Sequence, residues 1–232
     1  MELGGVPEHL LVLGGGYIGL EFGQLFRRLG SRVTIVQSGD QLLAREDPDV
    51  AEEVTKILRQ DGIDVLLNAK TTHVDQAGPI VRLEIGGPEG ATFVAGSHLL
   101  VAVGRTPNSD TLNLTAAGIQ SDKHGFIQVN DQLETSVEGV YALGDIKGGP
   151  AFTHISYDDF RIIQANLLEK KNASTKDRQV PYCVFMDPQL GRIGMTENEA
   201  RALGRKIRVA KLPMSSVARA LELDETRGFM KA

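Results

Sequence analysis

The amino-acid sequence is poor in cysteine, in long apolar runs and in clustered positive charge. Cys183 is the only cysteine, so the chain can form neither an intrachain disulfide nor, by itself, a thiolate metal cluster. Its apolar runs are far shorter than the about 20 residues that span a bilayer. No basic tract suggests binding to nucleic acid or to an anionic membrane, and residues 1–9 contain no hydrophobic signal core. These absences favour a cytoplasmic protein.

Apart from glycine, the composition is that of an ordinary globular protein. Hydrophobic residues make up 41% and charged residues 24% of the 232 residues, and the formal net charge is −5. This length allows one large domain or two smaller ones. The 26 glycines exceed the usual share of about 7%, and several stand where a backbone has to come close to a ligand.

The first part of the chain alternates buried strands with amphipathic helices. A short apolar run is followed by three glycines and then by apolar residues at helical spacing, and a similar alternation follows. Asp47 and Pro48 are predicted to be the N-cap and the first residue of the second helix. The predicted order is strand 10–13, helix 18–29, strand 33–36, helix 48–61 and strand 65–67. This order is typical of a parallel nucleotide-binding sheet.

From residue 71 the pattern changes to short strands without helices between them. Residues 80–85, 91–95 and 99–103 are separated by glycine-rich turns, which predicts an antiparallel meander. The later predicted elements are strands at 126–129 and 139–143, a helix through Phe160 and Leu167, a polar linker at 169–179, a strand at 182–185, a short helix with a Thr196–Glu199 capping box, a strand at 207–212 and a last strand at the C-terminus.

A glycine motif connects the first predicted strand to the first predicted helix. Gly14, Gly16 and Gly19 form the pattern G-x-G-x-x-G, with Tyr17 and Ile18 between the last two glycines. The first glycine permits a tight turn, the second lets the backbone approach a pyrophosphate, and the third lets the helix pack closely on the strand. The amides at the helix start then face the phosphate charge. Alone, the glycines also fit a plain tight turn, but with the flanking strands and helix they predict nucleotide binding.

The end of the second predicted strand carries no carboxylate. In NAD-binding proteins an acidic residue at this point accepts hydrogen bonds from the ribose hydroxyls. Gln37 and Ser38 stand in its place, so no carboxylate repels a 2′-phosphate and no arginine holds one. Both residues also fit a solvated turn. The choice between NAD and NADP therefore stays open.

Two later segments carry weaker signals. Gly144–Asp145 follows a predicted strand, where a short carboxylate can accept hydrogen bonds from ligand hydroxyls, and residues 103–108 read Val-Gly-Arg-Thr-Pro-Asn. Taken singly, the first is more typical of a plain turn and the second of an extended loop. No metal site is predicted, because no ligand spacing links the histidines at positions 9, 73, 98 and 124.

Together, these motifs resemble the class I pyridine nucleotide–disulfide oxidoreductases, a family that includes dihydrolipoamide dehydrogenase, glutathione reductase and mercuric reductase. The resemblance covers essentially the whole chain, from VPEHLLVLGGGYIGLE to LDETRGFMKA. The segments VFMDPQLGRIGMTE and SSVARALELDETRGFMK are most similar to the mercuric-reductase-like branch. The resemblance implies a Rossmann-like α/β fold with a parallel sheet and a β-meander, followed by an α+β interface domain.

The resemblance also assigns residues to the NAD(P)H side of the site. It implies that the three motif glycines bind the pyrophosphate. Tyr17 matches the tyrosine that covers the nicotinamide pocket over the flavin, and Glu21 matches an acidic residue near the nicotinamide and the flavin. Without the resemblance, Glu21 would be interpreted as a solvent-exposed glutamate on a helix. Gly104 and Arg105 match the hinge segment that contacts the nucleotide. Ile18, in the glycine motif, and Gln37 and Ser38, after the second predicted strand, are further candidate cofactor-binding residues.

Three further residues match positions on the FAD side. Asp145 matches the aspartate that holds the ribityl chain of FAD. Thr153 and His154 match the start of a helix whose N-terminal dipole faces the pyrimidine ring of the flavin and stabilises negative charge there. His154 is therefore interpreted as a flavin-side helix residue, since the catalytic base of the family lies near the C-terminus.

The matched positions imply a piece of a larger enzyme. The N-terminal FAD domain, the C-x-x-x-x-C redox disulfide and the C-terminal His-x-x-x-x-Glu pair of the family have no counterpart here, and Cys183 is interpreted as a small buried residue. We divide the chain into an NAD(P)-binding domain (1–105), a central FAD-contacting region (106–178) and a truncated interface domain (179–232). We expect the complete enzyme to be a homodimer that reduces a small-molecule acceptor. This chain alone is expected to be inactive and not to retain FAD.

Three functions are compatible with the sequence. The leading hypothesis is hydride transfer from NAD(P)H to FAD, with electrons passing on to a disulfide, a metal ion or another acceptor. The second is a non-catalytic module that binds or senses NAD(P)H, which would have no physical need for Asp145 or for Thr153 and His154. The third is a flavoprotein of the NADH-oxidase type, which works without a redox disulfide.

Overall fold

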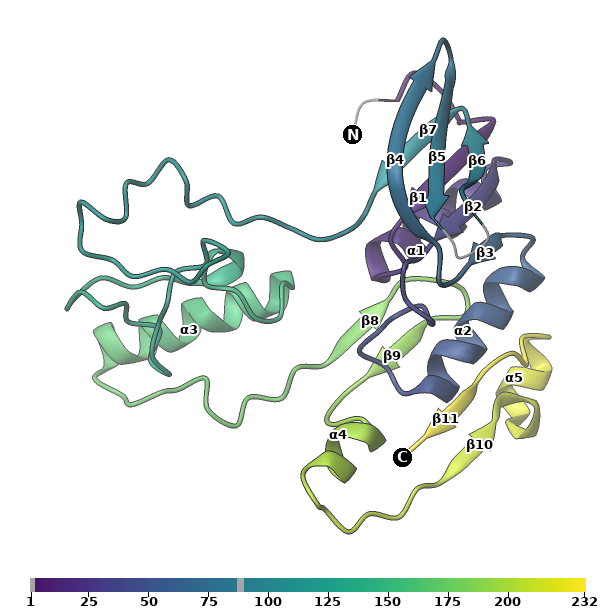
Figure 1. The fold of residues 1–232 in the computed structure, drawn as a ribbon. Coiled ribbons are helices and arrows are strands. Elements are labelled where there is room, and N and C mark those ends of the chain that lie inside the picture. Colours follow the sequence, from purple (N-terminus) through teal and green to yellow (C-terminus); the bar gives the residue numbers. More distant parts are fainter. Residues whose placement is uncertain (1–2, 87–89) are drawn as a thin grey trace. The chain divides into compact units, whose positions relative to one another are not determined.

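The two central strands of the parallel sheet are buried on both faces. The computed structural model describes residues 3–86 and 90–232, and Figure 1 labels their helices and strands. The sheet has the order β3-β2-β1-β7, with β1 at His9–Leu13, β2 at Arg32–Val36, β3 at Asp64–Leu66 and β7 at His98–Val101. In β2, Val33 and Ile35 lie next to Gly23 of the first helix. Val36 points the other way, into a separate core cluster. Burial on both faces explains why these strands are apolar without alternation.

Two helices connect these strands. α1 spans Tyr17–Arg28 and α2 spans Pro48–Gln60. The end of α1 is closed by Gly30 at φ 103°, and the amide of Ser31 donates to the carbonyl of Phe26 as in a Schellman motif. α2 begins at the predicted N-cap, Asp47. The strand–helix–strand order therefore brings the glycine turn to the carboxyl end of β1.

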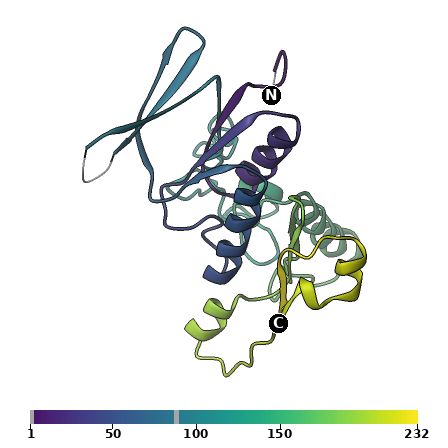
Figure 2. The ribbon, with the colours of Figure 1, turned by 90° about the vertical axis from the view of Figure 1, so that its right-hand side faces the viewer.

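An antiparallel meander covers the face of the parallel sheet opposite α1. Its strands pair in chain order and are β4 (Lys70–Ala77), β5 (Ile80–Gly86) and β6 (Thr92–Gly96). Leu83 of β5 is fully buried in a cluster with Leu11 and Val36 of the parallel sheet. Figure 2, turned by 90°, shows the β4–β5 hairpin projecting beyond the sheet. The meander thus supplies the second apolar layer that the strands require.

The prediction that residues 99–103 form the third meander strand is wrong. β7 pairs with β1 in parallel, with Leu99 opposite Leu11, and the meander begins instead with β4. β4 is mostly exposed, so it lacks the apolar pattern by which the sequence reasoning found strands. As a result Ala102, just after β7, lies beside the glycine turn.

The C-terminal segment packs in the same compact unit as the parallel sheet. This unit contains residues up to Val103 together with 183–191 and 195–232. The elements in this part of the chain are β8 (Tyr182–Val184), β9 (Leu190–Arg192), α4 (Glu197–Ala202), β10 (Lys211–Pro213), a 3-10 turn (Met214–Ser216), α5 (Ala218–Glu222) and β11 (Phe229–Lys231). Tyr182 at the start of β8 and Arg192 at the end of β9 belong to the second unit. The capping box predicted at the start of α4 is confirmed, with both of its hydrogen bonds present. The strand predicted at 207–212 is mostly wrong, because only Lys211 and Leu212 of that range lie in a strand, β10.

The second compact unit contains residues 104–182 and 192–194. Its regular elements are the 3-10 helix η1 (Gly144–Lys147) and α3 (Thr153–Glu169). The strands predicted at 126–129 and 139–143 are wrong, because each segment makes only an isolated bridge. Side-chain oxygens of Asp122 and Asn130 accept amides two and four residues further on, so the chain bends repeatedly here. No helix within 3–86 and 90–232 is long and apolar enough to cross a membrane.

Candidate nucleotide and flavin sites

The glycine turn after β1 has the geometry that a pyrophosphate site needs. Gly14 has φ 110°, and a Cβ there would lie 2.4 Å from the carbonyl oxygen of Ala102. A Cβ on Gly19 would lie 2.3 Å from the carbonyl oxygen of Gly14. At Gly16, by contrast, a Cβ would meet no heavy atom within 4 Å. The first and third glycines are therefore required by the fold, whereas the second leaves open space where a ligand can approach.

The N-terminus of α1 is suited to an anion. Gly16 is its extended N-cap, no described side chain caps the helix, and its first turn contains no acidic residue. The first amides of a helix have no partner within the helix, and the helix dipole places partial positive charge at this end. A phosphate would supply both the acceptors and the negative charge. The helix start thus fits part of a dinucleotide.

Gln37 lies beside this turn, but its side chain is bonded to the protein. Its Oε1 accepts a hydrogen bond from the Gly15 amide at 3.0 Å, and its Nε2 donates to the carbonyl oxygen of Gln41 at 3.2 Å. The next residue, Ser38, is exposed. Gln37 therefore fixes the glycine turn, a role that the sequence reasoning missed. Ser38 is the neighbouring residue that solvent or a ribose can reach.

Tyr17 and Glu21 lie on one side of α1, four residues apart. Oε1 of Glu21 accepts a hydrogen bond from the backbone amide of Phe185 at 2.9 Å, so the C-terminal segment holds this carboxylate. Burial, reinforced by the charge of Glu21, raises the pKa of the Cys183 thiol. A raised pKa disfavours the reactive thiolate form of Cys183.

In the second unit, Arg105 and Asp145 form an ion pair. Nη1 of Arg105 donates to Oδ2 of Asp145 at 3.0 Å and to the carbonyl oxygen of Ala151 at 3.4 Å. The two side chains are 47% and 58% exposed, respectively. The structure thus brings together two residues that the sequence reasoning assigned to different cofactors. Their exposure leaves the carboxylate open to a ligand hydroxyl.

The start of α3 is bordered by stacked rings. Thr153 is its first residue, no described side chain caps the helix, and the first turn contains no acidic residue. The ring of Phe152 stacks on His154 at 5.4 Å between centroids and on Tyr182 at the same distance, with interplanar angles of 15° and 13°. Positive helix charge beside planar rings suits a planar ligand that carries negative charge.

A buried ion cluster under η1 was missed by the sequence reasoning. Asp159 has no exposed surface and accepts hydrogen bonds from the Gly144 amide at 2.9 Å and from Arg178 at 2.6 Å. Lys147 lies 3.3 Å from the same carboxylate. A sequence signal was available, because Asp159 stands four residues after Ile155 on the buried face of α3. A charge at such a position needs partners inside the fold.

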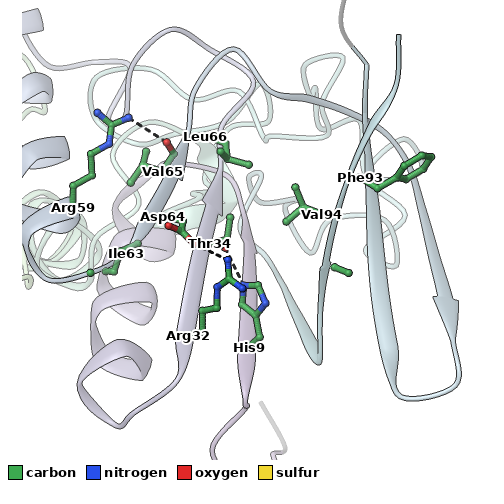
Figure 3. A pocket seen from close by; sticks show the side chains of 12 residues that line it. His9, Arg32, Thr34, Arg59, Ile63, Asp64, Val65, Leu66, Phe93 and Val94 are labelled. Atoms are coloured by element: carbon green, nitrogen blue, oxygen red, sulfur yellow. Dashed lines mark hydrogen bonds and ion pairs between the residues drawn. The ribbon is translucent and has the colours of Figure 1, made fainter.

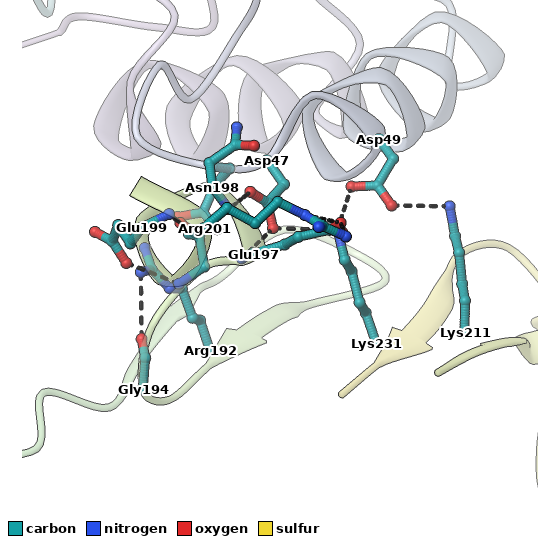
Figure 4. Close-up of polar contacts among 12 residues, drawn as sticks. Asp47, Asp49, Arg192, Gly194, Glu197, Asn198, Glu199, Arg201, Lys211 and Lys231 are labelled. Carbon is teal, nitrogen blue, oxygen red and sulfur yellow. Dashed lines mark hydrogen bonds and ion pairs between the residues drawn. The ribbon is translucent and has the colours of Figure 1, made fainter. Parts of the chain in front are cut away.

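A second missed cluster joins α2 to the C-terminal segment (Figure 4). The carboxylate of Asp47 accepts the backbone amides of Glu197 and Asn198 at 2.9 and 3.0 Å and the ammonium of Lys231 at 3.1 Å. Asp47 is therefore the N-cap residue of α2 by position, while its side chain caps α4 together with the N-cap Thr196, by accepting the first two amides of that helix. Burial alone would raise the pKa of Asp47, but the two amides and Lys231 outweigh burial and hold this pKa below its ordinary value.

An open depression of about 690 Å³ lies beside the amino ends of the parallel strands and the meander strand β6 (Figure 3). The polar side chains that line it bond to one another. Nε2 of His9 lies 2.9 Å from the hydroxyl oxygen of Thr34, and Nη2 of Arg32 donates to Oδ2 of Asp64 at 3.2 Å. Burial, followed by the charge of Arg32, lowers the pKa of His9. Nucleotides bind at the carboxyl ends of parallel strands, so this depression is separate from the glycine turn.

Among residues 3–86 and 90–232, no three His, Cys, Asp or Glu side chains gather as a metal site.

The parallel sheet, its glycine turn and the covering meander define a Rossmann-like α/β protein. The family model described as pyridine nucleotide-disulphide oxidoreductase matches residues 1–159. The model for the dimerisation domain of pyridine nucleotide-disulphide oxidoreductases matches residues 180–232. The chain belongs to the pyridine nucleotide-disulphide oxidoreductase family.

Curated relatives from several bacteria match along the chain. A probable pyridine nucleotide-disulfide oxidoreductase RclA from Escherichia coli is 41% identical, over 100% of this chain and 52% of that protein. A mercuric reductase from Lysinibacillus sphaericus is 38% identical, over 100% of this chain and 42% of that protein. A dihydrolipoyl dehydrogenase from Thermus scotoductus is 38% identical, over 98% of this chain and 49% of that protein. The chain spans about half the length of these relatives.

Solved structures agree with this placement. The HOCl-induced flavoprotein disulfide reductase RclA from Escherichia coli superposes with a TM-score of 0.90 at 41% identity, covering 100% of this chain and 52% of that one. LpdA from Mycobacterium tuberculosis gives a TM-score of 0.88 at 30% identity, covering 99% and 49%. The predicted fold class and family are confirmed, and the relatives carry the names of oxidoreductases, as the predicted enzyme class requires.

Proposed function

We propose that this chain is the NAD(P)H-binding and flavin-contacting part of an FAD-dependent oxidoreductase. The observation that carries the proposal is the glycine turn. Gly14 and Gly19 are required by the fold, whereas Gly16 borders open space at an uncapped helix start without acidic residues. When bound, NAD(P)H would supply a hydride, and FAD would accept it and pass electrons to a further acceptor.

The nucleotide would be held along the first turn of α1. The amides at Gly16, Tyr17 and Ile18 would meet the pyrophosphate at the positive end of the helix. Tyr17 and Glu21 would border the nicotinamide, and the bond from the Phe185 amide would fix the Glu21 carboxylate. The exposed Ser38 would lie on the ribose side, with Gln37 holding the turn behind it. No carboxylate there would oppose a 2′-phosphate, so both NADH and NADPH are expected ligands.

FAD would be contacted by the second unit. The exposed carboxylate of Asp145 fits the hydroxyls of a ribityl chain, and Arg105 would orient that carboxylate through their ion pair. Thr153 and His154 would present the positive end of α3 to the pyrimidine ring and stabilise negative charge on the reduced flavin. Gly104 would connect this unit to the nucleotide-binding sheet.

The proposal also covers the electron acceptor, the oligomeric state and the location of the enzyme. The acceptor would be a disulfide, a metal ion or another small molecule. Cys183 is the only cysteine of this sequence, so a redox thiol pair would need a second cysteine from outside it. The match to a dimerisation domain supports a homodimer. A location in the cytoplasm stays a prediction from composition.

The alternative of a non-catalytic NAD(P)H sensor is less well supported. A sensor would have no use for an exposed Arg105–Asp145 pair or for a second uncapped helix start at Thr153. A flavoprotein of the NADH-oxidase type would use both features in the same way. It differs from a disulfide oxidoreductase in the redox disulfide, which this chain does not contain.

The nucleotide site can be tested with a matched pair of glycine variants. Gly16→Val places a side chain where the pyrophosphate has to approach, whereas Gly191→Val adds the same side chain at an equally open, exposed position in β9. We expect Gly16→Val to weaken NADH and NADPH binding at least tenfold (about 1.4 kcal/mol) in calorimetric titrations. Circular-dichroism melting should be unchanged for both variants. Equal nucleotide affinity of Gly16→Val and wild type would refute the assignment.

A further inference from the structure

The turn that carries Asp145 lies directly on a buried carboxylate. Asp159 of α3 has no exposed surface, and its Oδ2 accepts the backbone amide of Gly144 at 2.9 Å. Gly144 is itself buried at φ 72°, and a Cβ there would lie 2.8 Å from Oγ of Ser156. The backbone thus approaches α3 too closely for a side chain, and its amide ends on Asp159.

The other end of the same turn is attached to the same carboxylate. Nζ of Lys147, the last residue of η1, lies 3.3 Å from Asp159, and the Lys147 side chain is only 9% exposed. Arg178 completes the cluster at 2.6 Å from Asp159, and its Nε also pairs with Asp158. The cluster therefore contains two carboxylates and two cations, of which Asp158 is the partly exposed member.

Such a cluster is a poor way to gain stability. Desolvating several charges offsets most of their attraction, and apolar side chains of similar volume often stabilise a fold as well or better. A buried ionic cluster is more readily explained by the geometry that it imposes. Here it holds the backbone amide of Gly144 before Asp145 and the side-chain ammonium of Lys147 after it, while the Asp145 side chain stays outside, paired with Arg105.

We propose that Asp159 is a positioning residue of the flavin site. It does not touch the flavin; it holds Gly144 and Lys147, and through them it sets the direction in which the Asp145 carboxylate points. The proposal rests on the proposed contact between Asp145 and FAD. It adds a residue that no motif assigns and that reaches the cofactor only through the backbone of η1.

The test is amide NMR on the isotope-labelled chain, comparing Asp159→Asn with Asp158→Asn. The control removes the neighbouring carboxylate of the same cluster, which is 40% exposed and pairs with Arg178. In wild type we expect a protected Gly144 amide, shifted downfield by its bond to a carboxylate. In Asp159→Asn this amide should move upfield and exchange at least tenfold faster, with shifts also at Asp145 and Lys147. Asp158→Asn should leave these signals in place, and amides in the middle of α3 should stay protected in both variants.

Two results would overturn the proposal. One is an unchanged Gly144 amide in Asp159→Asn, and the other is an increase in exchange that is equal in η1 and throughout α3, as a general loss of stability would produce. If Asp159→Asn does not fold, the exchange rate of the Gly144 amide in wild type tests the proposal. An amide that exchanges as fast as those of an open turn would contradict its hydrogen bond to Asp159.

The proposed function is tested separately by adding FAD at millimolar concentration to wild type. Perturbation of the Asp145 amide that is reduced in Asp159→Asn supports both ideas. A protected Gly144 amide without any response of Asp145 to FAD would contradict the flavin contact and leave the positioning of the turn intact.

Discussion

Replacing Asp47 by alanine is expected to loosen the C-terminal segment from α2. The Asp47 side chain is almost fully buried and accepts two amides at the start of α4 and the ammonium of Lys231. Alanine would leave the amides of Glu197 and Asn198 without an acceptor. Lys231 would keep its contacts with Glu197 and Asp49 at 2.9 and 3.0 Å, so one of the three interactions is partly compensated.

The size of the effect follows from these contacts. A hydrogen bond to a charged group contributes about 1.5–3 kcal/mol, and replacing a helix-capping Asp by alanine costs about 1 kcal/mol. Allowing for the contacts that Lys231 keeps, we expect the free energy of unfolding to fall by about 2–3 kcal/mol. The control is Glu222→Ala, which removes an exposed pair with Arg219. It should change this free energy by less than about 0.5 kcal/mol.

The pH dependence gives a second reading of the same interaction. The folded-state pKa of Asp47 lies below its ordinary value, so ionised Asp47 stabilises the fold at any pH above its unfolded pKa of about 3.9. That contribution is lost as the pH falls through the folded pKa. The difference between wild type and Asp47→Ala should therefore shrink below about pH 4.

Urea unfolding followed by circular dichroism is the assay, since the chain has no tryptophan. Stabilities are compared at pH 7 and through a series down to about pH 2. A loss of less than about 0.5 kcal/mol at pH 7, or a difference between the two proteins that is unchanged in acid, would refute the assignment of Asp47 as the cap of α4.

Three further predictions concern the glycine turn and the cofactors. Gly19→Ala should lower the melting temperature, because its Cβ would lie 2.3 Å from the Gly14 carbonyl oxygen; an unchanged melting temperature would contradict this packing. Ser38→Arg should tighten NADPH binding by about 1–2 kcal/mol through a charge-assisted bond to the 2′-phosphate, with NADH as the control ligand; equal gains for both nucleotides would remove Ser38 from the ribose side. The chain alone, mixed with FAD and desalted, should be colourless and should not oxidise NADPH in the presence of a disulfide, because its few flavin contacts cannot offset the cost of immobilising the cofactor; a yellow, active protein would contradict this.

The glycine turn and its flanking elements could be predicted from the sequence because their signals are local. An apolar strand, three glycines and a helical period follow one another directly, and the structure has them within a residue or two of the expected bounds. Asp47 and Pro48 at the start of α2 are a similar case. The neighbour of a strand, in contrast, depends on residues far away in the chain. The apolar residues at 99–103 suit a strand beside β1 as well as a strand in the meander. Their sequence alone therefore could not show which strand they pair with.

The supporting residues of the candidate sites were harder to find. Nothing near Gln37 in the sequence shows that its amide turns inward to the glycine turn. Asp159 could have been found from its position on the apolar face of α3, but its partner Arg178 comes from the segment interpreted as a polar linker. Polar clusters of this kind are assembled by tertiary contacts, and the periodicity of a single element reveals at most one member.

The cap that Asp47 provides for α4 also has a consequence for the order of folding. The contact closes a loop of 150 residues, and closing so long a loop has an entropic cost that local contacts do not carry. α4 has only six residues, far fewer than the about 12–15 that a helix in water needs for even marginal stability. We infer that α4 forms only after α2 and the parallel sheet have presented the Asp47 carboxylate to it. The parallel sheet would then act as the template on which the C-terminal segment folds.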